Sequence, residues 1–410
     1  MPWVADCLQG NLQIAMMPGL SSRPTFMNTI AEPLAVLEPT AQAALLRLQA
    51  VRAHDYARSR NHLEGAVTRL SPYITHGVLT LPQVLETVQE GERARDAKER
   101  ALPPDHKFIN ELAWREYFHH VWQHEGKGIF ASLHDGPMPE SSYARVLPDD
   151  IRQGRTGVPA IDEAVHELYT TGYLHNHARM WLASYVVHLR KVHWRAGADW
   201  LYGHLLDGDL ASNHLSWQWV AGTGSHKPYL FNAGNVEKFA PSNWHSRGTV
   251  IDASYEALED VARSGKRLER PGRAAAAGAC AEPPLLNRPT FELPTAKAGD
   301  LDGAWLIHPW NLRAPPDTSR PVVGVFAASF HSRWAWSERR WHWVMALMRE
   351  HTERIVWCEG APPASARTVA DPHLRSWLLP GQGESVPRIW ADPGRRCRSF
   401  SQFWTRVQDQ

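Results

Sequence analysis

The fold is decided by two stretches, TGYLHNHARMWLASY at Thr171–Tyr185 and DGDLASNHLSWQW at Asp207–Trp219. Asp207, Asp209 and Asn213 stand where an ordinary core helix would carry aliphatic side chains. Polar groups inside a core need hydrogen-bond partners, and a large heteroaromatic ligand with its own donors and acceptors would supply them. The tryptophans offer flat surfaces for rings or bases. The pattern therefore indicates a buried redox cofactor beside a stacking cleft. The alternative is an Asp N-cap followed by an aromatic-rich core helix.

Helical signals dominate the surrounding chain, from residue 39 to about residue 241. Ile161, Val165 and Leu168 recur at helical spacing, and Gly172 stands where a C-cap would end that helix. The next helix carries an apolar stripe of Leu174, Ala178, Trp181, Tyr185 and Leu189. Strand-like alternation is nearly absent in this region, so we expect an all-α domain.

The last third of the chain has a different pattern. The segment Ser264–Ala298 contains an alanine run and several prolines, which is typical of a linker. The runs beyond it predict strands at Ala304–His308, Val322–Ala327 and Arg354–Cys358 and a helix at Glu338–His351, hence a small α/β domain with a parallel sheet. We therefore expect a mainly α protein with an irregular N-terminal segment (1–38), a helical domain (39–260), a linker (261–300) and a small α/β domain (301–410).

Length, charge and composition limit the kinds of protein that this chain can be. With 410 residues and a formal net charge of +1, the chain can bury a sizeable core, and its charge neither supports nor excludes a DNA partner. Cys7, Cys280, Cys358 and Cys397 show no CxxC spacing, and the 22 histidines form no HExxH motif, so we expect no disulfide framework and no metal site. Because Met1–Met17 lacks an unbroken apolar stretch and no run is long enough to span a bilayer, we expect a soluble cytoplasmic protein without a membrane partner.

Five ordered blocks resemble the DNA photolyase and cryptochrome family. They are VTRLSPYITHGVLT at 67–80, FINELAWREYFH at 108–119, GRTGVPAID at 154–162, the two opening stretches and, as a short addition, EKF at 237–239. The resemblance covers roughly residues 56–241 and implies the all-α FAD-binding domain of that family.

The resemblance also implies which residues hold the FAD diphosphate. Thr68 and Ser71 match a family motif whose hydroxyls and backbone amides bind the phosphates, and Val67 replaces the first threonine of that motif. If nothing replaces that hydroxyl, the lost hydrogen bond costs about 1–3 kcal/mol. The residues implied at this end of FAD are Tyr56, Thr68, Arg69, Leu70, Ser71 and Arg115. Read without the family, the Thr and Ser before Pro72 are simply a helix N-cap.

A second group matches residues around the flavin ring. Arg179 and Asp207 match a salt bridge against the flavin, and Asp209 matches the carboxylate that accepts from the flavin imide N–H. Asn213 matches the residue that faces the reactive ring nitrogen, and a neutral Asn there favours repair over light sensing. The alternative is a buried Arg–Asp pair that joins two helices without a ligand.

The resemblance implies a pocket for damaged DNA and a route for photoreduction. The residues that match the pocket for a base-flipped cyclobutane pyrimidine dimer are Glu111, Trp114, Asn176, Met180 and Trp219. His177 departs from the family, which usually has arginine there. Trp217 and Trp194 match the inner members of a tryptophan chain that photoreduces the flavin. No tryptophan stands at the outer position, so either Tyr143 substitutes or photoreduction is slow.

The domain order departs from the family, whose members place an α/β antenna domain before the helical domain. The α/β segment follows here, and we place no antenna chromophore in it. We expect a monomeric, FAD-dependent lyase that repairs cyclobutane dimers in DNA with light. The alternatives are a cryptochrome-like light sensor without repair activity and a non-photochemical flavoprotein or nucleic-acid-binding module.

Overall fold

The computed structural model describes residues 37–95, 101–266 and 278–409. Nearly all of the predicted irregular segment 1–38 and the alanine run of the predicted linker lie outside these ranges. Within them, no helix has both the length and the apolar character needed to cross a bilayer.

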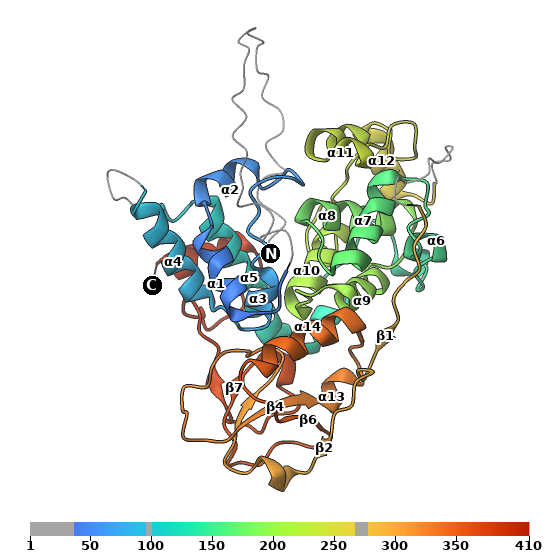
Figure 1. Ribbon diagram of the computed structural model, residues 1–410. Helices are drawn as coiled ribbons and strands as arrows, with labels where there is room; N and C mark the ends of the chain where they lie inside the picture. The colour runs from blue at the N-terminus through green and yellow to red at the C-terminus, as the bar shows by residue number, and fades with distance from the viewer. Residues whose placement is uncertain (1–36, 96–100, 267–277, 410) are drawn as a thin grey trace.

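The first group of helices precedes residue 126. Thr40 begins it as an N-cap, since its hydroxyl accepts from the Ala43 N–H at 3.0 Å. The group consists of α1 (Ala41–Gln49), α2 (Ala53–Ser59), α3 (Ser71–Thr75), α4 (Leu81–Arg93) and α5 (Lys107–Glu125). Figure 1 shows these helices on one side of the molecule, with the later helices facing them.

The second group of helices contains both opening stretches. Its members are α6 (Asp149–Arg152), α7 (Pro159–Thr171), α8 (Asn176–Ser184), the π-helical turn η3 (Tyr185–Leu189), α9 (Trp194–His204), α10 (Leu210–Ala221), α11 (Ala233–Phe239) and α12 (Tyr255–Arg263). Helix α7 ends at Gly172, whose φ of 70° is the left-handed conformation that the sequence predicted for this C-cap. Helices α9 and α10 are joined by the short loop that carries Asp207 and Asp209.

The C-terminal part is an α/β domain, as predicted. Its four-stranded sheet has the order β2-β6-β4-β3 and is parallel throughout. The strands are β2 (Thr295–Ala296), β3 (Trp305–Ile307), β4 (Val322–Ala327) and β6 (Ile355–Cys358), with α14 (Glu338–Arg349) between β4 and β6. The smaller elements are β1 (Leu285–Leu286), α13 (Ala328–His331), β5 (Trp336–Ser337), β7 (Val369–Ala370), β8 (Glu384–Ser385) and α15 (Phe400–Gln408). Strand β2 lies within the predicted linker, because two residues are too few to show an alternating pattern.

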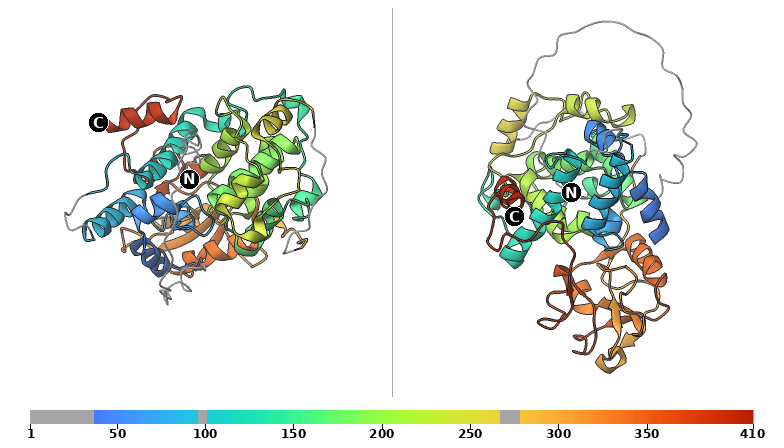
Figure 2. Two further views of the ribbon diagram at one scale, coloured as in Figure 1. Left: turned by 90° about the horizontal axis from the view of Figure 1, so that it is seen from above. Right: turned by 90° about the vertical axis from the view of Figure 1, so that its left-hand side faces the viewer.

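The hydrophobic core divides the chain differently from the predicted domains. Helices α1–α5 share one cluster of buried residues with the α/β domain and with parts of α9 and α10, whereas α6–α12 supply other buried residues to a second cluster. For example, the rings of Tyr73 and Trp343 lie 5.4 Å apart, and the Trp343 indole donates to the Leu37 carbonyl at 2.9 Å. The α/β domain therefore packs against the helical domain as an integral part of the fold (Figure 2).

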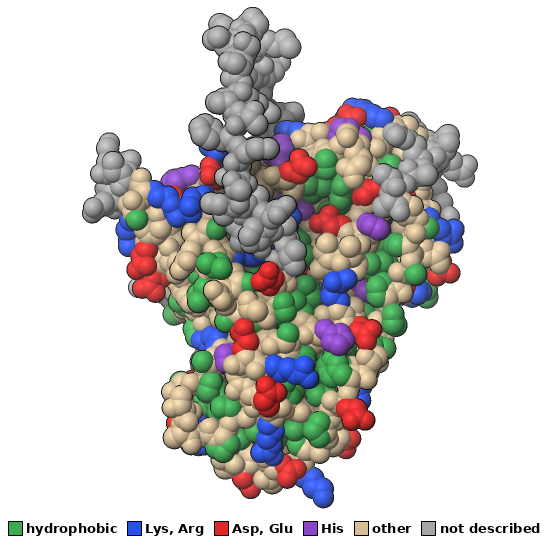
Figure 3. Space-filling model, in the orientation of Figure 1, with side chains coloured by type: hydrophobic (Ala, Val, Ile, Leu, Met, Phe, Trp, Pro, Cys, Tyr) green, Lys and Arg blue, Asp and Glu red, His purple; other side chains and the backbone are tan. Residues whose placement is uncertain are grey.

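The C-terminal segment returns to α5. The Glu116 carboxylate accepts from the backbone N–H groups of Ile389 at 2.6 Å and Trp390 at 3.3 Å. Helix α15 then packs against α5, where the Phe403 and Tyr117 rings lie 5.7 Å apart. On the face shown in Figure 3, acidic and basic side chains are interspersed, in keeping with the near-zero net charge.

Candidate functional site

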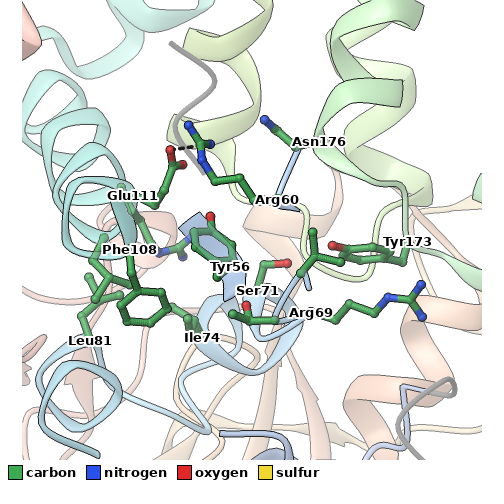
Figure 4. Close-up of a pocket in the computed structure, with 14 residues that line it drawn as sticks. Tyr56, Arg60, Arg69, Ser71, Ile74, Leu81, Phe108, Glu111, Tyr173 and Asn176 are labelled. Atoms are coloured by element: carbon green, nitrogen blue, oxygen red, sulfur yellow. Dashed lines mark ion pairs between the residues drawn. The ribbon is translucent and has the colours of Figure 1, made fainter. Parts of the chain in front are cut away.

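A cavity opens between α2, the loop before α3, α5 and the start of α8. It encloses about 770 Å³ of empty space, part of it open to solvent. The predicted residues that line it are Tyr56, Thr68, Arg69, Ser71, Glu111, Arg115 and Asn176 (Figure 4). These residues come from four separate stretches of the sequence. Leu70, which was also predicted here, is buried beside the cavity.

The loop before α3 has an unusual backbone. Arg69 has a φ of 51°, which a residue with a side chain adopts only at an energetic cost of roughly 1–3 kcal/mol. Its guanidinium lies over the Tyr173 ring at 5.7 Å, and the guanidinium of Arg179 lies 5.5 Å from the same ring. The structure therefore holds two cations beside the hydroxyl-bearing loop, where a diphosphate would need them.

Arg179 and Asp207 form the buried ion pair that the sequence predicted. Nη2 of Arg179 donates to both carboxylate oxygens, at 2.8 Å and 3.0 Å. Burial raises the pKa of Asp207, but the Arg179 guanidinium outweighs it, so the net shift is downward. Asp207 is thus ionised at neutral pH.

Asp209 caps α10 and faces two basic side chains of α5. Its Oδ1 accepts from the Ser212 N–H at 2.7 Å, and its Oδ2 lies 3.0 Å from His119 Nε2 and 3.5 Å from Arg115 Nη2. Burial raises the pKa of Asp209, but His119 and Arg115 hold it well below its usual range. Its side chain is only 1% exposed, so this charge needs those partners.

A second, smaller cavity is lined by the predicted flavin residues Arg179, Asp207, Asp209 and Asn213. It shares Ser71 and Arg115 with the first cavity. The Asn213 amide donates to the Ala198 carbonyl at 2.8 Å, which orients it.

The two cavities suit a dinucleotide such as FAD. Among the described residues, Asn176 Oδ1 and Ser212 Oγ are buried polar atoms without a hydrogen-bond partner. Such atoms are costly unless a ligand satisfies them. Arg69 and Arg115 supply positive charge for a diphosphate, and the ionised Asp209 can accept from an imide N–H.

Two charged or basic partners of the site carboxylates were not anticipated from the sequence. Arg60 follows α2 one turn after Tyr56, and its Nη1 lies 2.9 Å from Glu111 Oε1 (Figure 4). His119 follows Arg115 by one turn of α5 and, like Arg115, reaches the Asp209 carboxylate. The spacing of four residues is the only sequence signal for either position.

The structure does not bring all predicted dimer-binding residues into the cavity. Glu111 and Asn176 line it, and Met180 lies next to Asn176, with its Sδ 3.9 Å from the amide nitrogen. Trp114 instead stacks face to face on Phe400 of α15, with ring centroids 4.0 Å apart and an interplanar angle of 5°.

Trp219 and His177, the other two positions of the expected DNA site, also do not take the places expected for binding a dimer. The Trp219 ring lies 5.7 Å from that of Tyr229 and does not line the cavity. Burial lowers the pKa of His177 to about 4, so this residue supplies no positive charge to a substrate at neutral pH.

The predicted photoreduction residues lie on neighbouring helices. Gly197 stands one turn after Trp194 on α9, and a Cβ there would lie 2.3 Å from the Trp217 ring, so only glycine admits that ring. Towards the surface, the Tyr143 ring lies 6.4 Å from His193, whose ring lies 5.6 Å from Trp194. Aromatic rings thus connect Tyr143 with the interior.

One group of side chains in the described part of the chain has the spacing of metal ligands: His120, His124 and Asp392. However, His120 Nε2 accepts from the Cys397 N–H at 2.9 Å, so the proton of the neutral ring is on Nδ1. That nitrogen lies 2.9 Å from Asp392 Oδ2 and donates to it. Neither nitrogen of His120 is therefore available to a metal, and the group joins the C-terminal segment to α5.

Comparison with known proteins identifies the domain. Residues 108–273 match the family model described as the FAD binding domain of DNA photolyase. A deoxyribodipyrimidine photo-lyase of Streptomyces griseus is 34% identical over 175 residues, which cover 42% of this chain and 36% of that protein. One of Thermus thermophilus is 32% identical over 254 residues and 57% of each chain. A cryptochrome DASH of Oryza sativa is 34% identical over 175 residues, which cover 42% of this chain and 29% of that protein.

A solved structure of a Synechocystis cryptochrome is 28% identical, with a TM-score of 0.44 over 54% of this chain and 48% of that chain. The chain spans less than two thirds of the length of the curated relatives given above. The relatives carry both photolyase and cryptochrome names, and the family model gives FAD as the cofactor of the matched domain. The resemblance seen in the sequence is confirmed over residues 108–273, which match the FAD-binding domain of DNA photolyase.

Proposed function

We propose that this protein is a light-driven lyase that splits cyclobutane pyrimidine dimers in DNA. The observation that carries the proposal is the shared cavity: Glu111 and Asn176 line the same space as the loop of Thr68, Arg69 and Ser71. Polar groups able to bind a base edge therefore lie beside the predicted diphosphate site. When bound, FAD supplies light absorption and an electron that returns after the dimer is cleaved.

The residues of the chain supply binding, orientation and charge. Glu111 is held by Arg60 and can accept from a pyrimidine N–H, while the Asn176 amide can donate to a pyrimidine carbonyl. Arg69 and Arg115 would offset the charge of the diphosphate. In the reaction, the two carbon–carbon bonds that join the pyrimidines break and two ring double bonds form. The electron is returned, so no net oxidation or reduction occurs.

A repair assay tests this proposal. Chemically reduced, FAD-loaded protein is illuminated with an oligonucleotide that contains one thymine dimer, in single-stranded and double-stranded form. We expect light-dependent restoration of the two thymines. Absence of both repair and preference for the damaged oligonucleotide would contradict the lyase function.

Glu111→Ala should lower the yield of repair per absorbed photon more than it lowers DNA binding. The reason is that Glu111 holds the Arg60 guanidinium at the cavity, where its positive charge can offset the negative charge of the dimer that has received the electron. Loss of one hydrogen bond to a charged group is expected to reduce the yield by about 10- to 100-fold. The measurement compares wild type and Glu111→Ala at equal FAD occupancy. Glu86→Ala, an exposed position of α4, serves as the control and should leave the yield unchanged.

Trp217→Phe should abolish photoreduction of the FAD, because Trp217 and Trp194 are the inner positions of the predicted electron route. Repair by chemically reduced protein should persist. The measurement follows flavin absorbance under blue light with an external reductant. Trp200→Phe is the matched control, a buried tryptophan of α9 whose indole donates to Tyr169 instead. Efficient photoreduction in a Trp194→Phe/Tyr143→Phe double variant would show that electrons travel elsewhere.

A light sensor without repair activity is the second candidate. The observation that favours it is the stacking of Phe400 on Trp114, which places the C-terminal helix over a ring expected to bind the dimer. A sensor would couple the flavin state to the position of α15. If the repair assay is negative and illumination changes the protease sensitivity of residues 395–409, the sensor becomes the better assignment.

A further inference from the structure

The loop between α9 and α10 is held from the α/β domain. It carries Asp207 and Asp209, which line the flavin cavity. The Thr75 and His76 side chains bind its Asp207 and Leu206 carbonyls, whereas the Gly208 carbonyl and the Leu210 N–H are bound by side chains from beyond residue 330. The Gly208 carbonyl accepts from Nη2 of Arg340 at 2.6 Å, and the Tyr202 carbonyl accepts from Nη1 at 3.0 Å. One guanidinium of α14 therefore joins the end of α9 to the centre of the loop.

Arg340 is a fully buried cation. It is 0% exposed, and its guanidinium carbon lies 4.1 Å from the centroid of the Trp336 ring. Burial lowers the pKa of Arg340, whereas the charges of Asp207 and Asp209 oppose that shift. The carboxylates of the loop thus help to keep in place the cation that binds the loop backbone.

Arg340 packs so closely against Gly208 that no side chain fits at position 208. A Cβ at this position would lie 2.4 Å from Arg340 Nη1 and 2.6 Å from the Tyr202 carbonyl oxygen. The side chain of Arg340 therefore occupies the space between the loop and α9, and movement of either partner would shift the carboxylates on both sides of Gly208.

His373 binds the other end of the loop. Its Nε2 accepts from the Leu210 N–H at 3.2 Å, so its proton is on Nδ1, which lies 2.6 Å from Asp371 Oδ1. The ring stacks on Trp310 with centroids 4.5 Å apart and an interplanar angle of 8°. Asp371 and Trp310 thus hold the imidazole in the one tautomer that can accept from the start of α10.

We propose that Arg340 and His373 are positioning residues of the FAD site, through which the α/β domain holds Asp207 and Asp209 in place for the flavin. The α/β domain is then part of the cofactor site, although its residues do not line the smaller cavity that holds Asp207 and Asp209. This inference rests on FAD binding and not on repair, so a protein that binds FAD but repairs nothing would leave it intact.

Titration of apoprotein with FAD tests the proposal. Arg340→Met removes the charge and both hydrogen bonds, and the dissociation constant for FAD should rise at least about tenfold. Arg340→Lys keeps the charge but cannot bridge both carbonyls, so it should restore part of the affinity. The visible circular dichroism of the bound flavin should change in both variants, because the carboxylates beside it move.

Leu347→Ala is the control. It shortens a buried side chain of α14 that does not contact the loop through a hydrogen bond. It should lower the unfolding midpoint in urea yet keep the FAD affinity and the flavin spectrum of wild type. If Arg340→Met does not fold, His373→Leu decides the matter, with a tenfold loss of affinity expected. Wild-type affinity and spectrum in the Arg340 or His373 variants, or an equal loss of FAD in Leu347→Ala, would overturn the proposal.

Discussion

Asp209→Ala should abolish FAD retention during purification and lower the free energy of unfolding by about 3–5 kcal/mol. The substitution removes the N-cap of α10 and leaves His119 and Arg115 facing an uncharged site in the protein interior. It also removes the acceptor expected for the flavin imide N–H. The measurements are the ratio of flavin to protein after gel filtration and the urea unfolding curve of the apoprotein.

Two variants separate the causes of that loss. Asp209→Asn keeps an N-cap acceptor, so it should recover part of the stability while FAD retention stays poor. Asp150→Ala, which breaks a half-exposed ion pair with Arg190, should cost at most about 1 kcal/mol and keep the FAD. Normal flavin content in Asp209→Ala would rule out the assigned role.

The free energy of unfolding at acid pH gives an independent test of the role of Asp209. The pKa of this carboxyl lies well below its value of about 3.9 in an unfolded chain. Its contribution to stability is therefore complete above about pH 5 and is lost as the pH falls towards the folded pKa. Asp209→Asn should be less sensitive to acid than wild type in this range.

Trp114→Ala and Phe400→Ala should change the affinity for dimer-containing DNA in opposite directions. If a flipped base stacks on Trp114, loss of that ring removes on the order of 1–3 kcal/mol and weakens binding by roughly 10- to 100-fold. Phe400 now covers a face of the same indole, and an aromatic pair of this kind is worth about 0.5–1.5 kcal/mol. Its removal should therefore tighten binding by about two- to tenfold.

The double variant provides the decisive comparison. In Trp114→Ala/Phe400→Ala the gain from removing Phe400 should vanish, because the ring that it uncovers is gone. Thr405→Ala, an exposed change on α15, should have no effect. Binding is measured by fluorescence anisotropy with damaged and undamaged oligonucleotides at equal FAD occupancy. If Phe400→Ala weakens binding to both oligonucleotides equally, α15 is part of the DNA-binding surface and does not cover it.

Much of the fold could be predicted because its signals are local. The period of apolar residues and the glycine at position 172 specify α7, and short apolar runs specify β3, β4 and β6. The ordered motifs also named the loop residues Thr68 and Ser71, which line the cavity together with Tyr56. Side chains on one helix turn or one loop remain neighbours in any packing of the elements, so their grouping is visible in the sequence.

The helical class, the parallel sheet and the residue types expected around FAD all follow from local patterns and motifs of the sequence. Only the tertiary structure decided that Arg60 pairs with Glu111, that Phe400 covers Trp114, and that Arg340 and His373 hold the loop between α9 and α10. Arg60 and Glu111 lie in segments that are relatively close in the sequence, whereas the other contacts join elements far apart in the chain. Their partners are selected by the burial of apolar faces and by the need to satisfy buried polar groups, which act between elements and leave no local period in the sequence.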